Sequence, residues 1–394
     1  MKAWPRIALG ELLRRSDEAA VIDPATTYHE VTIKLWGKGV ISRGKVSGSD
    51  VVSVRRVVRA NQLILSKIDA RNGAIGLVPP ELDGAIVSND FPSFEFRDPD
   101  LCDAAFMGWL VRSSPFVELC KAASEGTTNR VRIKEDRFLD QKIALPPLTE
   151  QQALVARLDA LAEKTRQVEA HLDTIEHDSL RLLVTMAKRP DISDEQRQAS
   201  GWQQRTIADI ARLALSPESV DISSSYPNVG ILSYARGVFG KAPIEGATTS
   251  AKTLYKIRSG QFIYSRLFAF EGAYALVPDE FDGCYVSSEF PTFDVNTDLA
   301  SEKFLMALFM TENDWHRMRA STKGVGDRRL RIQPEHILAR PIWLPPPNEI
   351  SRIDALFDRY IALKDKHAGI RSANTALLPA TLERVFSEGA SAHA

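Results

Sequence analysis

Residues 145–188 read LPPLTEQQALVARLDALAEKTRQVEAHLDTIEHDSLRLLVTMAK, and this stretch decides the fold. Its two prolines end the preceding element, and Thr149 with Gln152 has the spacing of a helix-capping box. Apolar residues then recur in steps of four and three, a heptad pattern that predicts a long helix facing another helix. Such a helix would extend on the order of 60 Å, which indicates a spacer. The predicted interface positions are Leu154, Leu158, Leu161, Val168, Leu172, Ile175 and Leu182, with the polar Thr165 and Ser179 on the same seam.

A partner for this helix lies in the same chain. Residues 344–386 open with a similar proline block, LPPPNE, and Asn348 takes the capping place of Thr149. The heptads continue at Ile353, Leu356, Tyr360, Leu363, Ile370 and Leu377, with the polar His367 and Asn374 between them. Polar seam residues weaken packing but fix register and partner choice. A ligand role for His367 is the alternative, but no second histidine or carboxylate pattern stands beside it.

Length and composition limit the class of protein. A chain of 394 residues suggests two or more domains, and a net charge of −1 excludes a polybasic coat for indiscriminate nucleic-acid binding. Cys102, Cys120 and Cys284 form no CxxC pair, which favours a reducing compartment over a disulfide framework. Charges interrupt the first 18 residues, and no run has the length of a membrane span. We therefore expect a cytoplasmic protein with no membrane partner.

The chain is an internal duplication with a period near 199 residues. RANQLILSKIDARNGAIGLVPPELDGAIVSNDFPSF, at 59–94, aligns with RSGQFIYSRLFAFEGAYALVPDEFDGCYVSSEFPTF, at 258–293, and 18 of the 36 positions are identical. Trp4 pairs with Trp202 at an offset of 198. The two halves are therefore expected to share one fold.

Each copy reads as an α+β domain. Short apolar runs separated by Gly, Pro and Asp turns predict strands, and a helix is expected over 101–123 and over 301–320. Trp109 and Trp315 on these helices are interpreted as core aromatics rather than stacking platforms. The predicted organisation is a first module at 1–148, a spacer helix at 149–188, a linker at 189–201, a second module at 202–346, a second spacer helix at 347–388 and a tail at 389–394.

Basic residues recur at matching places in the two copies, in loops whose sequences otherwise differ. Arginine can anchor phosphates and can grip guanine with two hydrogen bonds, so a shared scaffold with dissimilar basic loops favours two modules that read different DNA sequences. The alternative is a solvated loop. The DNA-binding candidates are Lys67, Arg130, Arg132, Lys134, Arg266, Lys323, Arg328, Arg329 and Arg331, with Lys38, Asn72 and Arg236 as weaker ones beside Trp36 and Tyr234.

A search for catalytic motifs finds none. No GxxxxGK[ST] loop, HExxH, GxSxG or [DNS]PP[FY] sequence occurs, and the glycine pattern offers no place for S-adenosylmethionine. The acidic clusters at 79–83 and 278–282 lie in turn-forming contexts in both copies, so a turn is favoured over a metal site. We expect no catalytic residue, no metal and no cofactor on this chain.

The chain resembles the specificity subunit of type I restriction-modification systems, the HsdS family. The resemblance rests on W–x4–L–G–E–L at 4–12, LPPLTEQQALVARLDAL at 145–161 and ALLPATLERVF at 376–386, and it covers essentially the full chain. The second helix entry departs from the pattern at PPPNEI, although its heptads continue.

This resemblance implies two target recognition domains and an antiparallel coiled coil with pseudo-twofold symmetry that sets the gap between two DNA half-sites. Expected partners are double-stranded DNA, two methyltransferase subunits and a restriction (translocase) subunit. S-adenosylmethionine, ATP and Mg would belong to those partners. The alternatives are a stand-alone sequence-specific DNA-binding protein and a specificity chain of a related phage-defence system; a hydrolase with duplicated domains lacks any motif.

Overall fold

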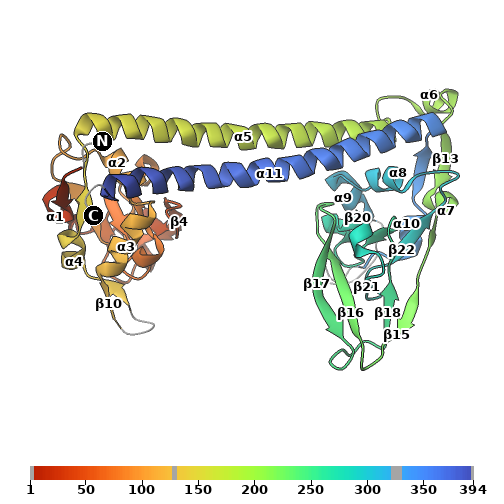
Figure 1. Cartoon of the computed structure of the whole chain (residues 1–394), viewed down its shortest axis with the longest axis horizontal. Helices are drawn as coiled ribbons and strands as arrows, with labels where there is room; N and C mark the ends of the chain where they lie inside the picture. The colour runs from red at the N-terminus through yellow and green to blue at the C-terminus, as the bar shows by residue number, and fades with distance from the viewer. Residues whose placement is uncertain (1–3, 127–130, 321–330, 392–394) are drawn as a thin grey trace. The chain divides into compact units, whose positions relative to one another are not determined.

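The computed structural model describes residues 4–126, 131–320 and 331–391 (Figure 1). By its internal contacts the chain divides into two units. Unit 1 comprises Met1–Ala170 and Gly369–Ala394, and unit 2 comprises His171–Ala368. The boundaries predicted along the sequence remain predictions.

Two long helices confirm the expectation from the heptads. They are α5 (Leu148–Lys188) and α11 (Pro347–Ser391). The division between the units falls inside both helices, so each unit holds one repeat and one end of each helix. Among the described residues, no helix combines the length and apolar character needed to cross a membrane.

Unit 1 is built around two four-stranded sheets. Their strand orders are β2-β9-β6-β7 and β4-β3-β8-β5, and neighbours are antiparallel except for β3 and β8. The strands are β1 (Arg6–Ala8), β2 (Leu13–Ser16), β3 (Thr27–Ile33), β4 (Val40–Ser47), β5 (Arg56–Val57), β6 (Leu63–Leu65), β7 (Ile75–Leu77), β8 (Ile86–Val87), β9 (Ser93–Phe96), β10 (Ser124–Glu125), β11 (Arg132–Ile133) and β12 (Lys142–Ala144). The helices are α1 (Leu9–Leu12), α2 (Ala104–Leu110), α3 (Ser114–Ala122) and α4 (Glu135–Asp140), with 3-10 turns η1 (Gly48–Asp50), η2 (Ala70–Asn72) and η3 (Pro80–Leu82).

Unit 2 repeats this topology. Its sheets have the orders β14-β22-β19-β20 and β17-β16-β21-β18-β15, the second with one added edge strand. The strands are β13 (Gln203–Thr206), β14 (Ala211–Leu213), β15 (Pro217–Ser219), β16 (Ser225–Ile231), β17 (Val238–Glu245), β18 (Thr253–Lys256), β19 (Phe262–Tyr264), β20 (Tyr274–Leu276), β21 (Tyr285–Val286), β22 (Thr292–Val295) and β23 (Pro341–Leu344). The helices are α6 (Asp194–Ala199), α7 (Ile207–Ile210), α8 (Glu302–Ala307), α9 (Glu312–Ala320) and α10 (Pro334–Leu338), with 3-10 turns η4 (Ala269–Glu271) and η5 (Asp279–Phe281). The matching strand orders confirm the duplicated α+β fold.

The helix expected over 101–123 is two helices. α2 ends at Leu110 and α3 begins at Ser114, with Pro115 in its first turn. Proline lacks the N–H that a continuing helix would need and is favoured in a first turn, so Pro115 fits the start of a new helix. Trp109 and Trp315 are 8% and 5% exposed, which confirms them as core aromatics.

A glycine turn is one scaffold element that both repeats share. Gly73 and Gly272 follow η2 and η4 with φ of 76° and 78°, a left-handed conformation that glycine adopts without a steric penalty. A Cβ on Gly272 would also lie 2.4 Å from the Trp315 ring. Both backbone conformation and packing therefore require glycine at this turn in unit 2.

In unit 1 the two long helices run antiparallel and are joined by both apolar and polar contacts. Leu158 is 2% exposed and belongs to the cluster that contains Leu382 and Phe386. Asn374 Nδ2 donates to the Thr165 carbonyl oxygen at 2.9 Å and to Glu169 Oε1 at 2.7 Å. These hydrogen bonds of Asn374 can form only in one alignment of the two helices. They therefore help to fix the register, as buried polar residues do in coiled coils.

In unit 2 the opposite ends of the same helices also pair antiparallel. Leu183 packs in a cluster with Ile353 and Phe357. Nearer the middle of the helices, His367 Nδ1 lies 2.8 Å from Glu176 Oε1. His367 is therefore a seam residue paired with a carboxylate.

The helix interface differs from the predicted seam at alternate positions. Leu158, Thr165 and Leu172 are at least partly buried as expected. Of the other predicted line, Leu154, Leu161, Leu356 and Leu363 are half-buried as expected. The remaining members turn outward, and the residue after each of them lies inward: Glu169, Glu176 and Leu183 on α5, and Arg371 and Leu378 on α11. The exposed side chains are Val168, Ile175, Leu182, Ile370 and Leu377.

Charge pairing explains this difference. Arg371 reaches Glu169 and His367 reaches Glu176, and these contacts form only if the carboxylates face the seam. An apolar residue one position earlier is then rotated by about 100°, because a helix has about 3.6 residues per turn. Heptad spacing alone cannot predict whether the apolar residue or the residue that follows it faces the partner helix.

Candidate nucleic-acid interface

In unit 1 the structure brings together two of the predicted basic residues, Lys67 and Arg132, beside β11. The N–H of Ile133 donates to the Lys67 carbonyl oxygen at 2.8 Å, which ties β11 to the end of β6. Lys67 Nζ lies 2.7 Å from Glu135 Oε1, and Arg132 lies 2.7 Å from Asp90 Oδ1. We call Lys67, Asp90, Arg132 and Glu135 the loop-base cluster of unit 1.

Unit 2 builds its counterpart from the matching residues. The Ile332 N–H donates to the Arg266 carbonyl oxygen at 3.0 Å, and Arg331 Nε lies 2.8 Å from Glu289 Oε2. Arg266 donates to the Gln333 side chain instead of pairing with a carboxylate. In both repeats two cations and one acid thus lie on matching positions of the backbone. The partner of Lys67 is Glu135, whereas the partner of Arg266 is Gln333, which is one position earlier in the alignment and matches Lys134.

The arginine ion pairs of these clusters, Arg132 with Asp90 and Arg331 with Glu289, are accessible to solvent, whereas the pair of Lys67 with Glu135 is largely buried. The side chains of Arg132 and Asp90 are 52% and 42% exposed. An exposed pair of this kind contributes only about 0–1 kcal/mol to stability. Such an arginine can therefore exchange its carboxylate for a phosphate or a base edge at little cost in folding free energy.

Several predicted residues lie elsewhere. Arg130, Lys323, Arg328 and Arg329 fall outside the described residues. Lys134 precedes α4, next to the loop-base cluster. Asn72 ends η2, and its carbonyl oxygen accepts the Trp36 N–H at 2.9 Å, which joins η2 to the turn that carries Lys38. The corresponding turn of unit 2 carries Arg236, whose guanidinium lies 5.8 Å from the Tyr234 ring centre.

A second basic surface was missed by sequence reasoning. β3 and β4 form a hairpin at a sheet edge, and residues 41–45 of β4 are all exposed. Arg43 and Lys45 lie on this edge, and within the described part of the chain neither has a carboxylate partner. In unit 2, Lys241 lies on the equivalent edge strand β17, which Figure 1 shows paired with β16 in a long ribbon. The absence of alternating apolar residues in ISRGKVS, at 41–47, was the available signal.

Apolar side chains on the long helices form another exposed feature. Val168, Ile175 and Leu182 recur every seven residues on α5 and are 36%, 46% and 52% exposed. Ile370 and Leu377 do so on α11. Apolar residues repeated at heptad spacing on one side of a helix are typical of a surface that packs against further helices.

The two buried cysteines, Cys102 and Cys120, have no reactive environment. Burial raises the pKa of both Cys102 and Cys120 to about 12, so their thiols stay protonated near neutral pH. Within the described ranges, no group of three or more His, Cys, Asp or Glu side chains is arranged to hold a metal ion.

Comparisons with known proteins identify the fold. No protein-family model matches the chain, and no curated protein matches it significantly. The solved HsdS subunit from Thermoanaerobacter tengcongensis is similar over 98% of this chain and 97% of its own, with a TM-score of 0.53 and 20% identity. A chain from a structure concerning complex assembly and conformational transition of the type I R-M system is similar over 98% of both chains, with a TM-score of 0.65 and 19% identity. The chain therefore has the fold of the HsdS specificity subunits of type I restriction-modification systems, as its sequence resemblance implied.

Proposed function

We propose that this chain is the DNA sequence-specificity subunit of a type I restriction-modification complex. Each repeat reads one half of a two-part double-stranded DNA site, and the chain itself performs no chemistry. The observation that carries the proposal is the recurrence of the loop-base cluster, with Lys67 and Arg132 in one repeat and Arg266 and Arg331 in the other. Phosphate contacts from such a common frame would set the register, and the differing loops would read the bases.

The hairpins extend this proposed interface. A two-stranded ribbon fits the major groove of B-form DNA, where each base pair presents a distinct pattern of donors and acceptors. β3 with β4 is such a ribbon, and its exposed edge carries Arg43 and Lys45. β16 with β17 is the equivalent ribbon in unit 2, with Lys241 on its edge. The two ribbons differ in sequence, which suits two different half-sites.

The exposed apolar residues of α5 and α11 supply the second part of the proposal. Val168, Ile175, Leu182, Ile370 and Leu377 would be covered by two methyltransferase subunits, which supply S-adenosylmethionine and modify adenine. A restriction subunit using ATP and Mg could then join this core. A stand-alone DNA-binding protein would have no partner to cover these side chains, so they favour the complex. The expected location is the cytoplasm, where the DNA is.

Sequencing of modified adenines in host DNA, with and without this gene, tests the proposal. We expect one methylated motif, made of two short sequences and a fixed unread gap, to disappear when the gene is deleted. Restoring the gene should restore the same motif. If every methylated motif is unchanged by the deletion, the proposed role in directing methylation is wrong.

A further inference from the structure

In unit 1 an arginine satisfies two carbonyl groups beside α1. Arg97 follows β9, and its backbone N–H donates to the Leu12 carbonyl oxygen at 2.8 Å. Its side-chain Nε donates to the carbonyl oxygens of Gly10 and Leu13, at 3.0 Å each. These two oxygens therefore form an acceptor pair that holds a guanidinium group.

Unit 2 keeps the backbone of this arrangement but is one residue shorter. The Asn296 N–H donates to the Ile210 carbonyl oxygen at 2.8 Å, as Arg97 does to Leu12. Asn296 Oδ1 also accepts the Asp298 N–H at 3.2 Å, a turn that Asp98 makes with Asp100 in unit 1. Asn296 thus combines the roles of Arg97 and Asp98, and unit 2 has no residue in the place of the Arg97 side chain.

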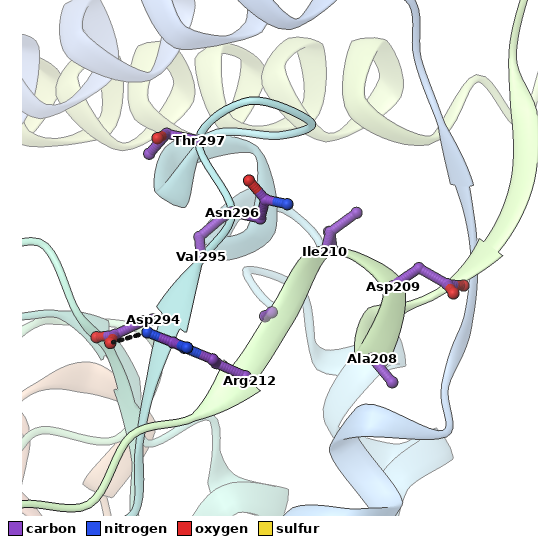
Figure 2. Close-up of a pocket in the computed structure, with 9 residues that line it drawn as sticks. Ala208, Asp209, Ile210, Arg212, Asp294, Val295, Asn296 and Thr297 are labelled. Carbon is purple, nitrogen blue, oxygen red and sulfur yellow. Dashed lines mark ion pairs between the residues drawn. The ribbon is translucent and has the colours of Figure 1, made fainter.

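A cavity of about 440 Å³ lies at this place in unit 2 (Figure 2). The carbonyl groups of Ala208 and Ala211 correspond to those of Gly10 and Leu13. No side chain in the described part of the chain donates to either oxygen. Figure 2 shows the Arg212 side chain directed at Asp294, 3.8 Å away, rather than at these carbonyl groups. The acceptor pair is therefore kept, whereas its donor is missing.

We propose that this cavity binds a guanidinium group, supplied by an arginine side chain of a partner protein. Planar guanidinium donors suit a fixed pair of acceptors better than an ammonium group does. Asp209 lines the cavity too, but Figure 2 shows its carboxylate directed away from Arg212 and Asn296. Hydrogen bonds from Thr206 lower the pKa of this carboxyl group and keep it ionised.

A neighbouring cavity indicates that the guanidinium belongs to a polypeptide. This second cavity, of about 530 Å³, shares Asp209 with the first. Pro341, Ile342 and Trp343 line one part of it, and Gln204, Arg205 and Thr206 line the rest. A small free guanidinium compound would leave the part of this cavity beside Ile342 and Trp343 empty. An arginine followed by an apolar residue would fill both, and burial of that apolar side chain would add affinity.

Binding of small probes to the full-length protein tests the proposal. N-acetyl-L-arginine methylamide should shift the amide NMR signals of Ala208 and Ala211 in a saturable manner. The citrulline analogue has nearly the same shape without the charge, and it should bind about tenfold more weakly or worse, because a hydrogen bond from a charged donor is stronger than one from a neutral donor. Absence of saturation by the arginine probe, or equal binding of the citrulline probe, would overturn the proposal.

Two variants locate the site. Insertion of an arginine between Val295 and Asn296 should restore the unit 1 arrangement and abolish probe binding. Arg97→Ala should have the opposite effect and open a second site, seen as new saturable shifts at Gly10 and Leu13. Arg14→Ala, which removes a neighbouring arginine with no contact to these carbonyl oxygens, should open none. If the insertion prevents folding, Arg97→Ala still decides, because no gain of binding would contradict the assignment.

The source of the guanidinium is tested separately. N-acetyl-Arg-Leu-methylamide should bind more tightly than the arginine probe alone, because leucine can enter the neighbouring cavity beside Trp343. Equal affinity of the two probes would refute the polypeptide source and assign the cavity to small guanidinium compounds.

Discussion

Asp314 lies buried beside two cations at the place where α5 meets the body of unit 2. Its side chain is 3% exposed, pairs with Lys188 at the end of α5, and lies 2.8 Å from Arg340. Burial alone would raise the pKa of Asp314, but Lys188 and Arg340 outweigh burial and hold the pKa below its usual range. The carboxylate therefore stays ionised and neutralises charge inside the unit.

Replacing Asp314 should destabilise unit 2. Asp314→Asn leaves two partly buried cations without a counter-charge, and breaking such a group costs about 3–5 kcal/mol. Urea unfolding followed by tryptophan fluorescence would measure the loss. Asp191→Asn, which removes an exposed carboxylate paired with Arg189, is the matched control and should leave the midpoint unchanged. Equal effects of the two substitutions would contradict this account of Asp314.

The pH dependence of stability follows from the direction of the Asp314 shift. Its folded-state pKa is lower than that of the unfolded chain, so its contribution is fully present above the ordinary Asp pKa of about 3.9. That contribution is lost as pH falls through the folded-state value. The free energy of unfolding should therefore differ less between neutral and strongly acidic pH in the Asp314→Asn variant than in the wild type. A difference between variant and wild type that is constant with pH would contradict the assigned ionisation.

The basic clusters allow the two half-sites to be addressed separately. Arg132→Ala should reduce the difference in affinity between sequence variants of one half-site and leave the difference between variants of the other half-site unchanged. Arg331→Ala should have the opposite effect on the two half-sites. Binding to a panel of half-site variants at constant salt would measure this, since phosphate contacts depend on ionic strength. If either substitution impairs both halves equally, the repeats are not independent readers.

At the residue scale, the sequence predicted where the cations recur but not how they are neutralised. Arg132 pairs with Asp90, 42 residues earlier, and Arg331 pairs with Glu289. Only the fold brings these distant segments together. Arg43 and Lys45 were missed because β4 and β17 share one basic position, Arg43 with Lys241, but differ at most other positions. The lack of a side chain equivalent to Arg97 in unit 2 can be recognised only by comparing the backbones of the two repeats.

At the scale of elements, the long helices combine a structural face and an exposed apolar face. Leu158→Asp should destabilise unit 1, because it places a charge in the cluster with Leu382 and Phe386, where large losses of several kcal/mol are expected. Leu182→Asp, on a side chain that is 52% exposed, should leave the stability of the isolated chain nearly unchanged. Thermal unfolding of the two variants would measure the contrast, and equal destabilisation would contradict the placement of these faces.

The same pair of variants separates folding from assembly. Leu182→Asp should fold normally yet fail to retain methyltransferase subunits when the complex is purified. If the Leu182→Asp variant retains the methyltransferase subunits at wild-type levels, the exposed apolar residues are not the surface that binds them.

Heptad spacing predicted both helices and the positions of Leu158, Thr165 and Leu172, because a regular apolar period is a strong signal. It could not predict that Glu169 and Glu176 face the seam. Their partners, Arg371 and His367, lie about 200 residues away, and neither pairing has a local signature.

At the scale of the whole molecule, the proposal assigns recognition to the repeats and spacing to the helices. Deleting one heptad from α5 and the facing heptad from α11 should shorten the unread gap and leave both half-sequences unchanged. Sequencing of the methylated motif would show the result. A changed half-sequence would count against helices that serve as spacers.

The most direct test of the central claim is selection of binding sites from a random double-stranded DNA library by the full-length protein, followed by sequencing. The account predicts enrichment of two distinct short sequences separated by a fixed number of unspecified base pairs. Enrichment of a single continuous sequence, or no enrichment at all, would contradict a chain built from two DNA-reading repeats.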